Sequence, residues 1–257
     1  MEKTVNIFGL SLPLLTDKER SSVLCELIKN GRGASMLTPN VEILRKAEKD
    51  TALHACLRQA SLLLPDGIGV YLAARLLGAK QATRSSGIDA AEELLHLCEQ
   101  SDTPLYLLGG RYGVAEAAAK RLRAKHPRLT ICGCHHGYFS LGGEEDRAVC
   151  EDIRDTGAQV VFVCLGCPKQ ETWIERHRHE LPCVHLLCGL GGSLDVWAGE
   201  HRRAPVLWQE AGLEWLWRSL SEPRRLAILP HFLAFFFKIL IERCHPKQVK
   251  PPLRRPL

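Results

Sequence analysis

Residues 160–171 read Val-Val-Phe-Val-Cys-Leu-Gly-Cys-Pro-Lys-Gln-Glu, an apolar run that gives way to polar residues after a Gly-Cys-Pro turn. Its apolar first half contains three valines, which is typical of a strand buried on both faces of a parallel sheet. Gly166 and Pro168 end that strand, and the polar residues that follow predict a helix from Lys169 to about Glu180. In open α/β sheets ligands bind beyond the carboxyl ends of the strands, and free N–H groups at a helix start favour an anion. This turn is therefore a candidate part of an active site, and an ordinary capped turn is the alternative.

The rest of the chain repeats the alternation of strand and helix. Short apolar runs that end in turn residues predict strands at residues 5–10, 35–37, 61–64, 105–108, 129–134 and 184–188. Helical spacing of apolar residues predicts helices at residues 17–30, 41–47, 52–60, 68–77, 89–100, 114–125 and 144–154. This order indicates an α/β fold, a Rossmann-like, mostly parallel sheet with helices on both faces. We assign residues 1–203 to this domain.

Residues 204–257 differ from the domain before them and form a helical C-terminal appendage. Of the 16 residues from Leu226 to Ile241, 13 are apolar. This run is shorter than the ~20 residues that span a membrane, and it contains Pro230 and Lys238. We therefore expect a helix that lies in a membrane interface. The alternative is a helix docked on the protein's own core or on a second subunit.

The net charge of +5 is unevenly distributed along the chain. From Arg218 onward, nine lysines and arginines stand against two glutamates, a local charge of +7 that leaves −2 for the rest. A basic tail indicates an anionic partner, whether an anionic lipid surface, a phosphorylated substrate or a nucleic acid. Because basic residues flank the apolar run at both ends, we expect an anionic membrane surface and no nucleic acid.

Eleven cysteines are scattered along the chain without the spacing of a disulfide framework. The N-terminus has no secretory apolar region, so we expect reduced, mostly buried thiols in a cytoplasmic protein. Cys164 and Cys167 form a C-x-x-C pair that zinc would favour. Further potential ligands are Cys132, Cys134, His135 and His136. Since Cys164 falls inside an apolar strand and no second spaced pair follows, we predict packing and no metal.

Five of the predicted strand ends carry residues suited to binding or catalysis. They are Thr38 with Asn40, Asp66, Gly109 with Gly110, Gln170 with Glu171, and Asp195. All follow their strands, so all should lie at one edge of a parallel sheet and outline a pocket. Asp66 is a candidate general base, because partial burial raises the pKa of a carboxylate toward the useful range. A plain Pro-Asp-Gly turn is the alternative.

Gly109 and Gly110 precede a predicted helix and would let the backbone approach a diphosphate. The full G-x-G-x-x-G pattern is absent, and no acidic residue ends a following strand in the way that a ribose-binding residue would. A nicotinamide cofactor is therefore disfavoured. Arg84, in the loop at residues 80–87, would balance phosphate charge, although a lone loop arginine is often only solvated.

In this order, the motifs resemble the TagA/WecG/CpsF family of bacterial glycosyltransferases, from Ile7 to about Arg225. In the first half they are Leu37-Thr38-Pro39-Asn40, Leu64-Pro65-Asp66-Gly67-Ile68-Gly69, Arg84 with Gly87 and Asp89, Leu107-Leu108-Gly109-Gly110 and His136-Gly137-Tyr138-Phe139. In the second half they are Leu165-Gly166-Cys167-Pro168-Lys169-Gln170-Glu171, Gly191-Gly192 with Asp195 and Gly199, Arg203-Ala204-Pro205, Gly212-Leu213-Glu214-Trp215, and Arg218 with Glu222-Pro223-Arg224.

The resemblance implies an inverting, UDP-sugar-dependent hexosyltransferase that needs no metal or other cofactor. Such an enzyme would move N-acetylmannosamine from UDP-ManNAc to undecaprenyl-diphosphate-linked N-acetylglucosamine. It would work as a peripheral protein on the inner face of the cell membrane, in the synthesis of a cell-wall polymer of the teichoic acid type.

The resemblance also implies roles for individual residues. Asp66 matches the general base, and the other active-site positions match Thr38, Arg84 and Gln170. Substrate-binding positions match Asn40, Gly109, Gly110, Tyr138 and Asp195, of which Tyr138 and Asp195 lie near the nucleotide. The segment that binds membrane and closes the site on the acceptor diphosphate matches Arg218, Arg224 and Arg225. Within the opening stretch we assign Gln170 to the site, because an amide both donates and accepts hydrogen bonds, and we assign Lys169 and Glu171 to flanking structure.

The chain departs from the family after Arg225, where Ala227-Ile-Leu-Pro230 replaces further arginines and tyrosines. The sequence therefore does not show how the residues after Arg225 contact the acceptor. It also leaves open which hexose is transferred, which polymer is made and whether the protein forms a homo-oligomer. Transfer of the uronic acid of ManNAc, or of another hexose for a surface or capsular polysaccharide, is one alternative function. The others are a non-catalytic membrane-associated scaffold and a nucleotide-dependent oxidoreductase.

Overall fold

The computed structural model describes residues 4–79, 86–201, 203–210, 214, 216–217 and 229–244. Its centre is a six-stranded sheet in the order β4-β3-β8-β7-β5-β6, with all neighbouring strands parallel. The strands are β3 (Ala34–Leu37), β4 (Leu62–Leu63), β5 (Leu105–Gly109), β6 (Ile131–His135), β7 (Val160–Cys164) and β8 (Leu186–Gly189). The strand of the opening stretch, β7, lies between β8 and β5, and all five of its residues are buried. The predicted α/β fold is confirmed.

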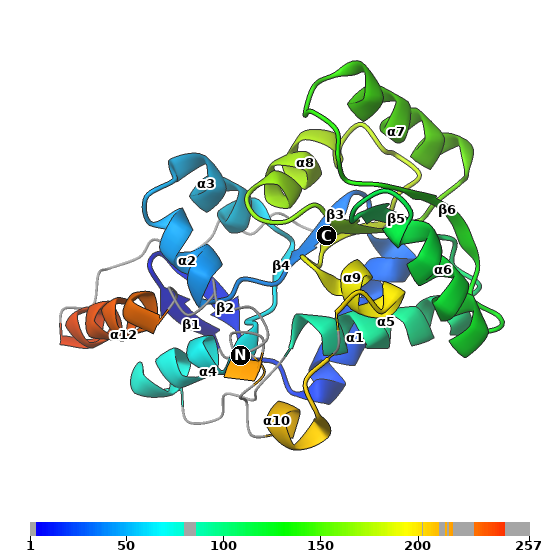
Figure 1. Cartoon of the computed structure of the whole chain (residues 1–257). Coiled ribbons are helices and arrows are strands. Elements are labelled where there is room, and N and C mark those ends of the chain that lie inside the picture. The colour runs from blue at the N-terminus through cyan, green and yellow to red at the C-terminus, as the bar shows by residue number, and fades with distance from the viewer. Residues whose placement is uncertain are drawn as a thin grey trace.

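The side chains of each strand alternate between the two faces of the sheet, which divides the interior into two cores. In β7, Val161 and Val163 face the first core, whereas Val160, Phe162 and Cys164 face the second. The first core includes side chains from α2 (Val41–Ala47), α3 (Thr51–Gln59), α4 (Gly67–Leu76), α7 (Glu144–Asp155) and α8 (Lys169–His177). The second includes side chains from α1 (Asp17–Asn30), α5 (Gly87–Gln100), α6 (Val114–Lys125) and α9 (Ser193–Ala198). Figure 1 shows α7 and α8 on one side of the sheet and α1, α5 and α9 on the other.

The ends of the helices follow local sequence signals. Helix α1 begins with a capping box, since Glu19 N donates to Thr16 Oγ1 at 3.3 Å and Thr16 N donates to Glu19 Oε2 at 2.7 Å. Helix α8 ends at His177, three residues earlier than predicted, and there the His177 ring lies 2.7 Å from Glu180 Oε2. Helix α5 begins at Gly87, two residues earlier than predicted. These shifts leave the order of the elements unchanged.

The prediction of a single strand at residues 5–10 is wrong. This segment belongs to a hairpin of β1 (Thr4–Ile7) and β2 (Leu10–Pro13), which pair antiparallel and stand apart from the main sheet. Phe8 and Gly9 form its two-residue turn with φ of 52° and 82°, the positive values that such hairpin turns require at both central residues. Phenylalanine is an unusual residue for that position, so the sequence lacked the common turn signal. The side chains of the hairpin that enter the first core are Val5, Ile7, Leu10 and Leu12.

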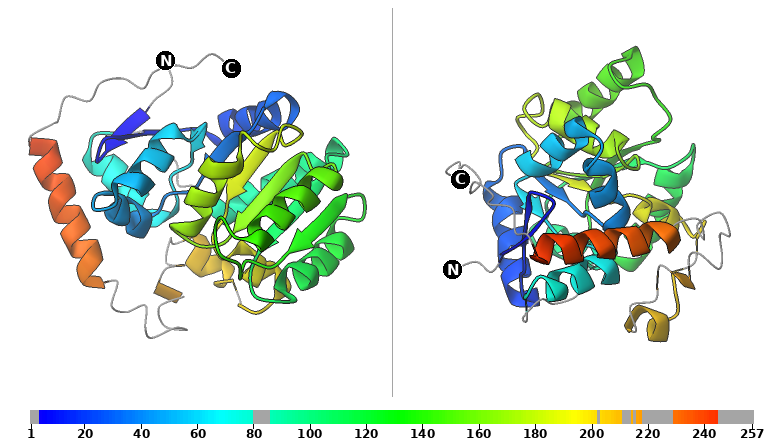
Figure 2. Two further views of the ribbon diagram at one scale, coloured as in Figure 1. Left: turned by 90° about the horizontal axis from the view of Figure 1, so that it is seen from above. Right: turned by 90° about the vertical axis from the view of Figure 1, so that its left-hand side faces the viewer.

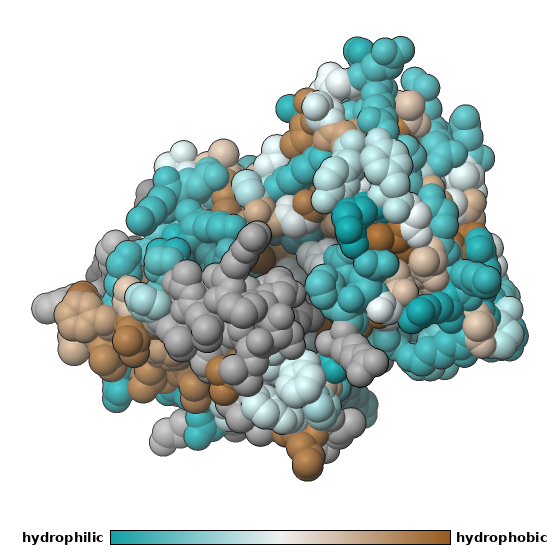
Figure 3. Space-filling view, in the orientation of Figure 1, coloured by the Kyte–Doolittle hydropathy of each residue, from teal (hydrophilic) through white to brown (hydrophobic). Residues whose placement is uncertain are grey.

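Helix α12 (Leu229–Cys244) packs against α2 and α4, close to the hairpin (Figure 2). Phe235 and Ile239 are fully buried there, and the Phe235 ring meets the Phe8 ring edge-on with centroids 5.6 Å apart. Lys238 Nζ lies 2.9 Å from both carboxylate oxygens of Glu48. The opposite side, which we call the open face of α12, exposes Leu233, Phe237, Leu240 and Ile241. Figure 3 shows this apolar surface in brown at the lower left.

The helix therefore docks on the protein's own core through one side, as the alternative expectation held, and keeps a second apolar side for another surface. Among the described residues, no helix is both long enough and apolar enough to cross a membrane.

The described C-terminal region before α12 comprises α10 (Val206–Glu210) and the residues 214 and 216–217. The rings of Trp208 and Trp217 meet edge-on at 5.6 Å, and Gln209 Nε2 donates to the carbonyl oxygen of Ala204 at 2.7 Å. The division of the chain into two domains stays a prediction.

Candidate active site

The carboxyl ends of the six strands form one row along the edge of the sheet, in the order of the strands. With about 4.8 Å between neighbouring strands, the row is about 24 Å long. In that order it carries Asp66 after β4, Thr38 after β3, Asp195 after β8, Gln170 after β7, Gly109 and Gly110 at the end of β5, and Tyr138 after β6. The strand order thus brings residues from six separate segments to one edge.

Asp66 lies where two helices begin. It directly precedes α4, and its Oδ1 accepts a hydrogen bond at 2.7 Å from the backbone N of Gly87, the first residue of α5. Ser86, the residue before α5, makes no capping bond with its own side chain, so Asp66 caps that helix instead. The N-termini of α4 and α5 both carry partial positive charge, which favours a negative side chain at this position.

Thr38 lies directly beneath the start of α5. Its Oγ1 donates a hydrogen bond to the carbonyl oxygen of Gly189 at 3.0 Å, which joins the ends of β3 and β8. A Cβ atom added to Gly87 would lie 3.1 Å from Thr38 Oγ1, so the backbone of α5 rests on this side chain. Thr38, Gly87 and Asp66 therefore form one continuous group of contacts.

Gln170 is only 2% exposed, and both ends of its amide are bound within the protein. Its Oε1 accepts a hydrogen bond from Gly191 N at 2.9 Å, and its Nε2 donates to Glu171 Oε1 at 2.9 Å. The amide thus fixes the loop between β8 and α9. Its direct contact with a substrate stays a prediction, and the contacts in the structure are supporting ones.

Glu171 and Lys169, which the sequence analysis assigned to flanking structure, both turn inward. Glu171 is 1% exposed, its Oε2 has no hydrogen-bond partner among the described residues, and burial raises the pKa of its carboxyl. Lys169 Nζ donates to the carbonyl oxygens of Gly137, at 2.8 Å, and of Phe139, and burial lowers the pKa of this amine. Lys169 therefore fixes the loop after β6. No local pattern in the sequence shows which of these polar residues points inward.

Gly109 and Gly110 form the turn that leads from β5 toward α6, with φ of 140° and 71°. A Cβ atom at Gly109 would lie 2.3 Å from the carbonyl oxygen of Cys164, so no other residue fits there. Gly137 N donates to the carbonyl oxygen of Gly110 at 2.8 Å. The turn thus holds the loops after β5, β6 and β7 in close contact.

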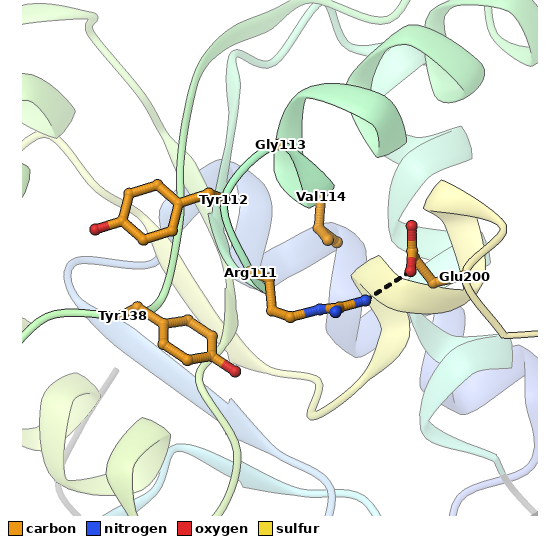
Figure 4. A pocket seen from close by; sticks show the side chains of 6 residues that line it. All are labelled: Arg111, Tyr112, Gly113, Val114, Tyr138 and Glu200. Carbon is orange, nitrogen blue, oxygen red and sulfur yellow. Dashed lines mark hydrogen bonds and ion pairs between the residues drawn. The ribbon is translucent and has the colours of Figure 1, made fainter.

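A cavity of about 500 Å³ opens beside this turn (Figure 4). It is lined by Arg111, Tyr112, Gly113, Val114, Tyr138 and Glu200. Arg111 Nη2 pairs with Glu200 Oε2 at 2.7 Å on one side of it. The rings of Tyr112 and Tyr138, which are 71% and 63% exposed, lie on the other side. Exposed aromatic rings beside the first turn of a helix suit a ligand that joins a flat ring to an anionic group.

His136 supports the tyrosine side of the cavity. Its ring centroid lies 3.8 Å from that of Tyr112, and its Nδ1 accepts a hydrogen bond from Tyr138 N at 3.3 Å. Because Nδ1 accepts, the proton of a neutral ring sits on Nε2, which lies 3.2 Å from Glu145 Oε1. Four residues of this region were not predicted from the sequence as site residues: Arg111, Tyr112, His136 and Glu200. Arg111 and Tyr112 fall within the glycine-rich turn, which is a usable signal, whereas Glu200 has none.

Two further predicted residues lie at the row, and they differ in their contacts. Asn40 caps α2, because its Oδ1 accepts hydrogen bonds from Glu42 N and Ile43 N, each at 3.0 Å. Asp195 lies in the first turn of α9, and its carboxylate makes no hydrogen bond with the described residues. The predicted residues that lie outside the described residues are Arg84, Arg218, Arg224 and Arg225.

Three groups of described side chains are close enough to hold a metal ion. They are His96 with Glu99 and His126, His135 with His136 and Glu145, and Asp146 with Cys150 and His177. The second group lies next to the cavity, but the ring of His136 directs an N–H toward Glu145, where a metal would need a lone pair.

The cysteines of the C-x-x-C pair pack into different parts of the interior, Cys164 in the second core and Cys167 against the first. Burial raises the pKa of Cys164 and of Cys167 to about 12, which disfavours the thiolate that binds a metal ion. All eleven cysteines are free, and Cys183 and Cys244 are the exposed ones.

Comparison with known proteins gives a concordant result. The sequence profile of the glycosyl transferase WecG/TagA/CpsF family matches residues 5–249. The chain is 33% identical over 215 residues to the N-acetylglucosaminyldiphosphoundecaprenol N-acetyl-beta-D-mannosaminyltransferases of Staphylococcus aureus strains MW2, NCTC 8325 and COL. These matches cover 84% of this chain and 83% of each relative. The family match includes every strand of the main sheet, both ends of the row and α12, and the chain belongs to the WecG/TagA/CpsF family of glycosyltransferases.

Proposed function

We propose that the protein transfers N-acetylmannosamine from UDP-ManNAc to undecaprenyl-diphosphate-linked N-acetylglucosamine, the acceptor and sugar that the names of its relatives give for those proteins. One observation carries this proposal. A carboxylate anchored at the starts of two helices, Asp66, stands at one end of a row of strand ends, and an aromatic-lined cavity opens toward the other end. This arrangement suits a base for the acceptor and a site for the nucleotide.

The nucleotide of the donor binds in the cavity near β5 and β6. Tyr112 and Tyr138 offer exposed rings for a uracil base, and stacking on a base is tolerant of small changes in geometry. The diphosphate then lies along the turn of Gly109 and Gly110 and the first turn of α6, where backbone N–H groups favour negative charge. From there the sugar extends along the row toward Thr38 and Asp66.

Transfer follows as a single displacement. Asp66 takes the proton of the acceptor hydroxyl, the hydroxyl oxygen attacks C1 of the sugar, and UDP leaves from the opposite face, so that the anomeric centre is inverted. Positioned N–H groups meet the charge that develops on the diphosphate, and Arg84, Arg218, Arg224 and Arg225 supply further positive charge. The scheme uses no metal ion and no other cofactor.

The acceptor enters from the Asp66 end of the row. Asp66 precedes α4, and α4 contacts α12, whose open face is apolar. An apolar helix face with basic residues nearby suits the interface of an anionic membrane. We therefore propose a peripheral enzyme on the inner face of the cell membrane, with the polyprenyl chain of the acceptor held in the bilayer beside α12.

The proposal is tested with the full chain, a short-chain polyprenyl-diphosphate-linked GlcNAc acceptor and a panel of UDP-sugars. We expect product with UDP-ManNAc, and a loss of kcat of about 10²–10⁴-fold in Asp66→Asn with UDP binding retained. A matched control is Asp102→Asn, an exposed residue at φ 51° where asparagine is tolerated.

Four outcomes would contradict parts of the proposal. Near wild-type turnover of Asp66→Asn, with UDP still bound, removes the base assignment. Product only with the uronic acid or another hexose changes the donor, and no transfer with any UDP-sugar favours a scaffold. Activity should also persist in excess EDTA, and a loss that one divalent ion restores would end the metal-free scheme.

A further inference from the structure

The first turn of α5 contacts charged side chains from two distant parts of the chain. On one side, Gly87 N donates to Asp66 Oδ1 at 2.7 Å. On the other side, Asp89 Oδ1 accepts a hydrogen bond from Arg203 Nη2. Gly87 and Asp89 are the first and third residues of the helix, so a displacement of this turn would move both contacts together.

Arg203 joins α5 to the C-terminal region. It lies between α9 and α10, and its Nε is 3.5 Å from Glu214 Oε1, beyond α10. Both of these atoms are buried and have no hydrogen-bond partner among the described residues, so the ion pair is their mutual contact. A largely buried ion pair is screened by salt less than an exposed one. Arg203 thus holds a carboxylate of the α/β body and a carboxylate of the C-terminal region at once.

The packing beneath α5 makes Asp66 sensitive to this contact. The backbone of Gly87 rests on Thr38, where even a methyl group would come within 3.1–3.3 Å. Since Thr38 is itself bonded to Gly189, the turn has little room to move inward. Loss of the contact between Arg203 and Asp89 would therefore displace Gly87 N, and the carboxylate of Asp66 that is bonded to it would move as well.

We propose that Arg203 is a positioning residue, which aligns the carboxylate of Asp66 through the first turn of α5. This inference rests on the proposed role of Asp66 as the general base. Through Arg203, the orientation of Asp66 would depend on the C-terminal region that contains Glu214. A misplacement of about 1 Å in a reacting group lowers rates by up to about 10²-fold, so the effect should be measurable.

The test compares Arg203→Gln, Asp89→Asn and the double variant with wild type, all as full chains. We expect each single variant to lower kcat about 10-fold, with the KM for UDP-ManNAc and the affinity for UDP within about twofold of wild type. The double variant should be no slower than either single one, because both changes break one contact. Arg203→Lys keeps the charge but has a single ammonium group in place of the two nitrogens that hold Asp89 and Glu214, so it should recover only part of the activity.

The control and the decisive comparison use other residues. Arg20→Gln breaks a different ion pair of α5, between Arg20 Nε and Glu93 Oε2 at 2.7 Å, and should leave kcat within about twofold of wild type. In an Asp66→Asn background, Arg203→Gln should change the residual rate by less than about twofold, because the base it aligns is gone.

The outcomes separate the two proposals. Equal loss from Arg203→Gln with and without Asp66, a raised donor KM with unchanged kcat, or wild-type kcat in Arg203→Gln would each overturn the positioning role and leave Asp66 as the base. Near wild-type turnover of Asp66→Asn would instead remove the base assignment, and with it the positioning role.

Discussion

Gln170 and Glu171 are neighbours in the first turn of α8, and both are buried with their polar groups inside the protein. Gln170 holds Gly191 N, and Glu171 accepts the other end of the same amide. A side chain used in this way affects a ligand through the loop that it holds. Substitutions of these two residues therefore test whether they stabilise the loop or contact the substrate directly.

Gln170→Ala should lower the free energy of unfolding by about 1–3 kcal/mol, because it leaves the Gly191 N–H without a partner. Denaturant unfolding measures this, with the exposed Gln100→Ala as control. If stability is unchanged while the donor KM rises, Gln170 contacts the substrate directly and the supporting role is wrong.

Glu171→Gln should change how stability depends on pH. Burial raises the pKa of Glu171 above its ordinary 4.5 in the folded state, so the folded protein holds this proton more tightly than the unfolded chain. Its contribution to stability is complete below about pH 4.5 and is lost as pH rises through the folded pKa. Glutamine has no such proton, so the variant should gain on wild type as pH rises, by about 1.4 kcal/mol for each unit of the pKa shift.

Urea unfolding of both proteins from pH 4 to pH 8 measures this difference. Parallel stability curves would show that Glu171 has the same pKa in the folded and unfolded states.

At the residue scale, the positions of the functional turns were easier to predict from the sequence than the contacts of the individual side chains. Asp66 was a candidate from its place after an apolar strand, but its bond to Gly87 spans 21 residues, and the bond from Arg203 to Asp89 spans 114. Such contacts depend on how helices pack, which no local pattern contains. Asn40 was predicted to bind substrate, and in the structure its Oδ1 caps α2 by accepting hydrogen bonds from Glu42 N and Ile43 N.

At the scale of elements, α12 has two apolar sides with different surroundings. Phe235 and Ile239 pack on the body of the protein, whereas the open face carries exposed leucine, phenylalanine and isoleucine side chains. Periodicity predicted an apolar helix of this width and left its partner undecided between protein and membrane. The structure shows a protein partner for one side of the helix, and a membrane as the partner of the open face stays a prediction.

The two sides of α12 should respond differently to substitution. Phe237→Ser with Leu240→Ser on the open face should change the free energy of unfolding by less than about 0.5 kcal/mol each and should abolish flotation with anionic vesicles. Phe235→Ala should destabilise the docked helix by about 3–5 kcal/mol. Leu207→Ser, at an exposed leucine of α10, is the control, and vesicle binding by the open-face variant equal to that of the control would refute the membrane role.

The main sheet was the most predictable part, because β7 and its neighbours are continuous apolar runs that end in turn residues. The N-terminal hairpin was missed, because Phe8 occupies a turn position at which sequence rules expect glycine or asparagine. Strand order was beyond local reasoning too. The neighbours β3 and β8 are separated by most of the chain, and their pairing depends on helix packing over the whole fold.

At the scale of the whole molecule, the row of strand ends carries the proposed nucleotide site toward one end and the proposed base toward the other. The cavity with Tyr138 lies near one end, and Asp66 lies at the other, on the side of α4 and α12. Substitutions at the two ends should therefore affect different substrates.

Tyr138→Ala should raise the KM for UDP-ManNAc about 10-fold, since stacking on a base contributes about 1–3 kcal/mol, and leave the acceptor KM within about twofold. The open-face variant of α12 should do the opposite when the acceptor is presented in vesicles. Steady-state kinetics with each substrate varied in turn measures both effects. Equal rises in both KM values for either variant would show that the two ends are not independent.

The distribution of thiols has a practical consequence for observing this enzyme at work. Most of its cysteines are shielded, and the two exposed ones lie at Cys183 and at Cys244, the last residue of α12. A maleimide dye should react first at these two positions, and a Cys183→Ser protein would be labelled first at the end of α12. The chain thus contains its own attachment point for a fluorescent dye. The emission wavelength and the fluorescence polarisation of that dye would change when the helix approaches a lipid bilayer during turnover.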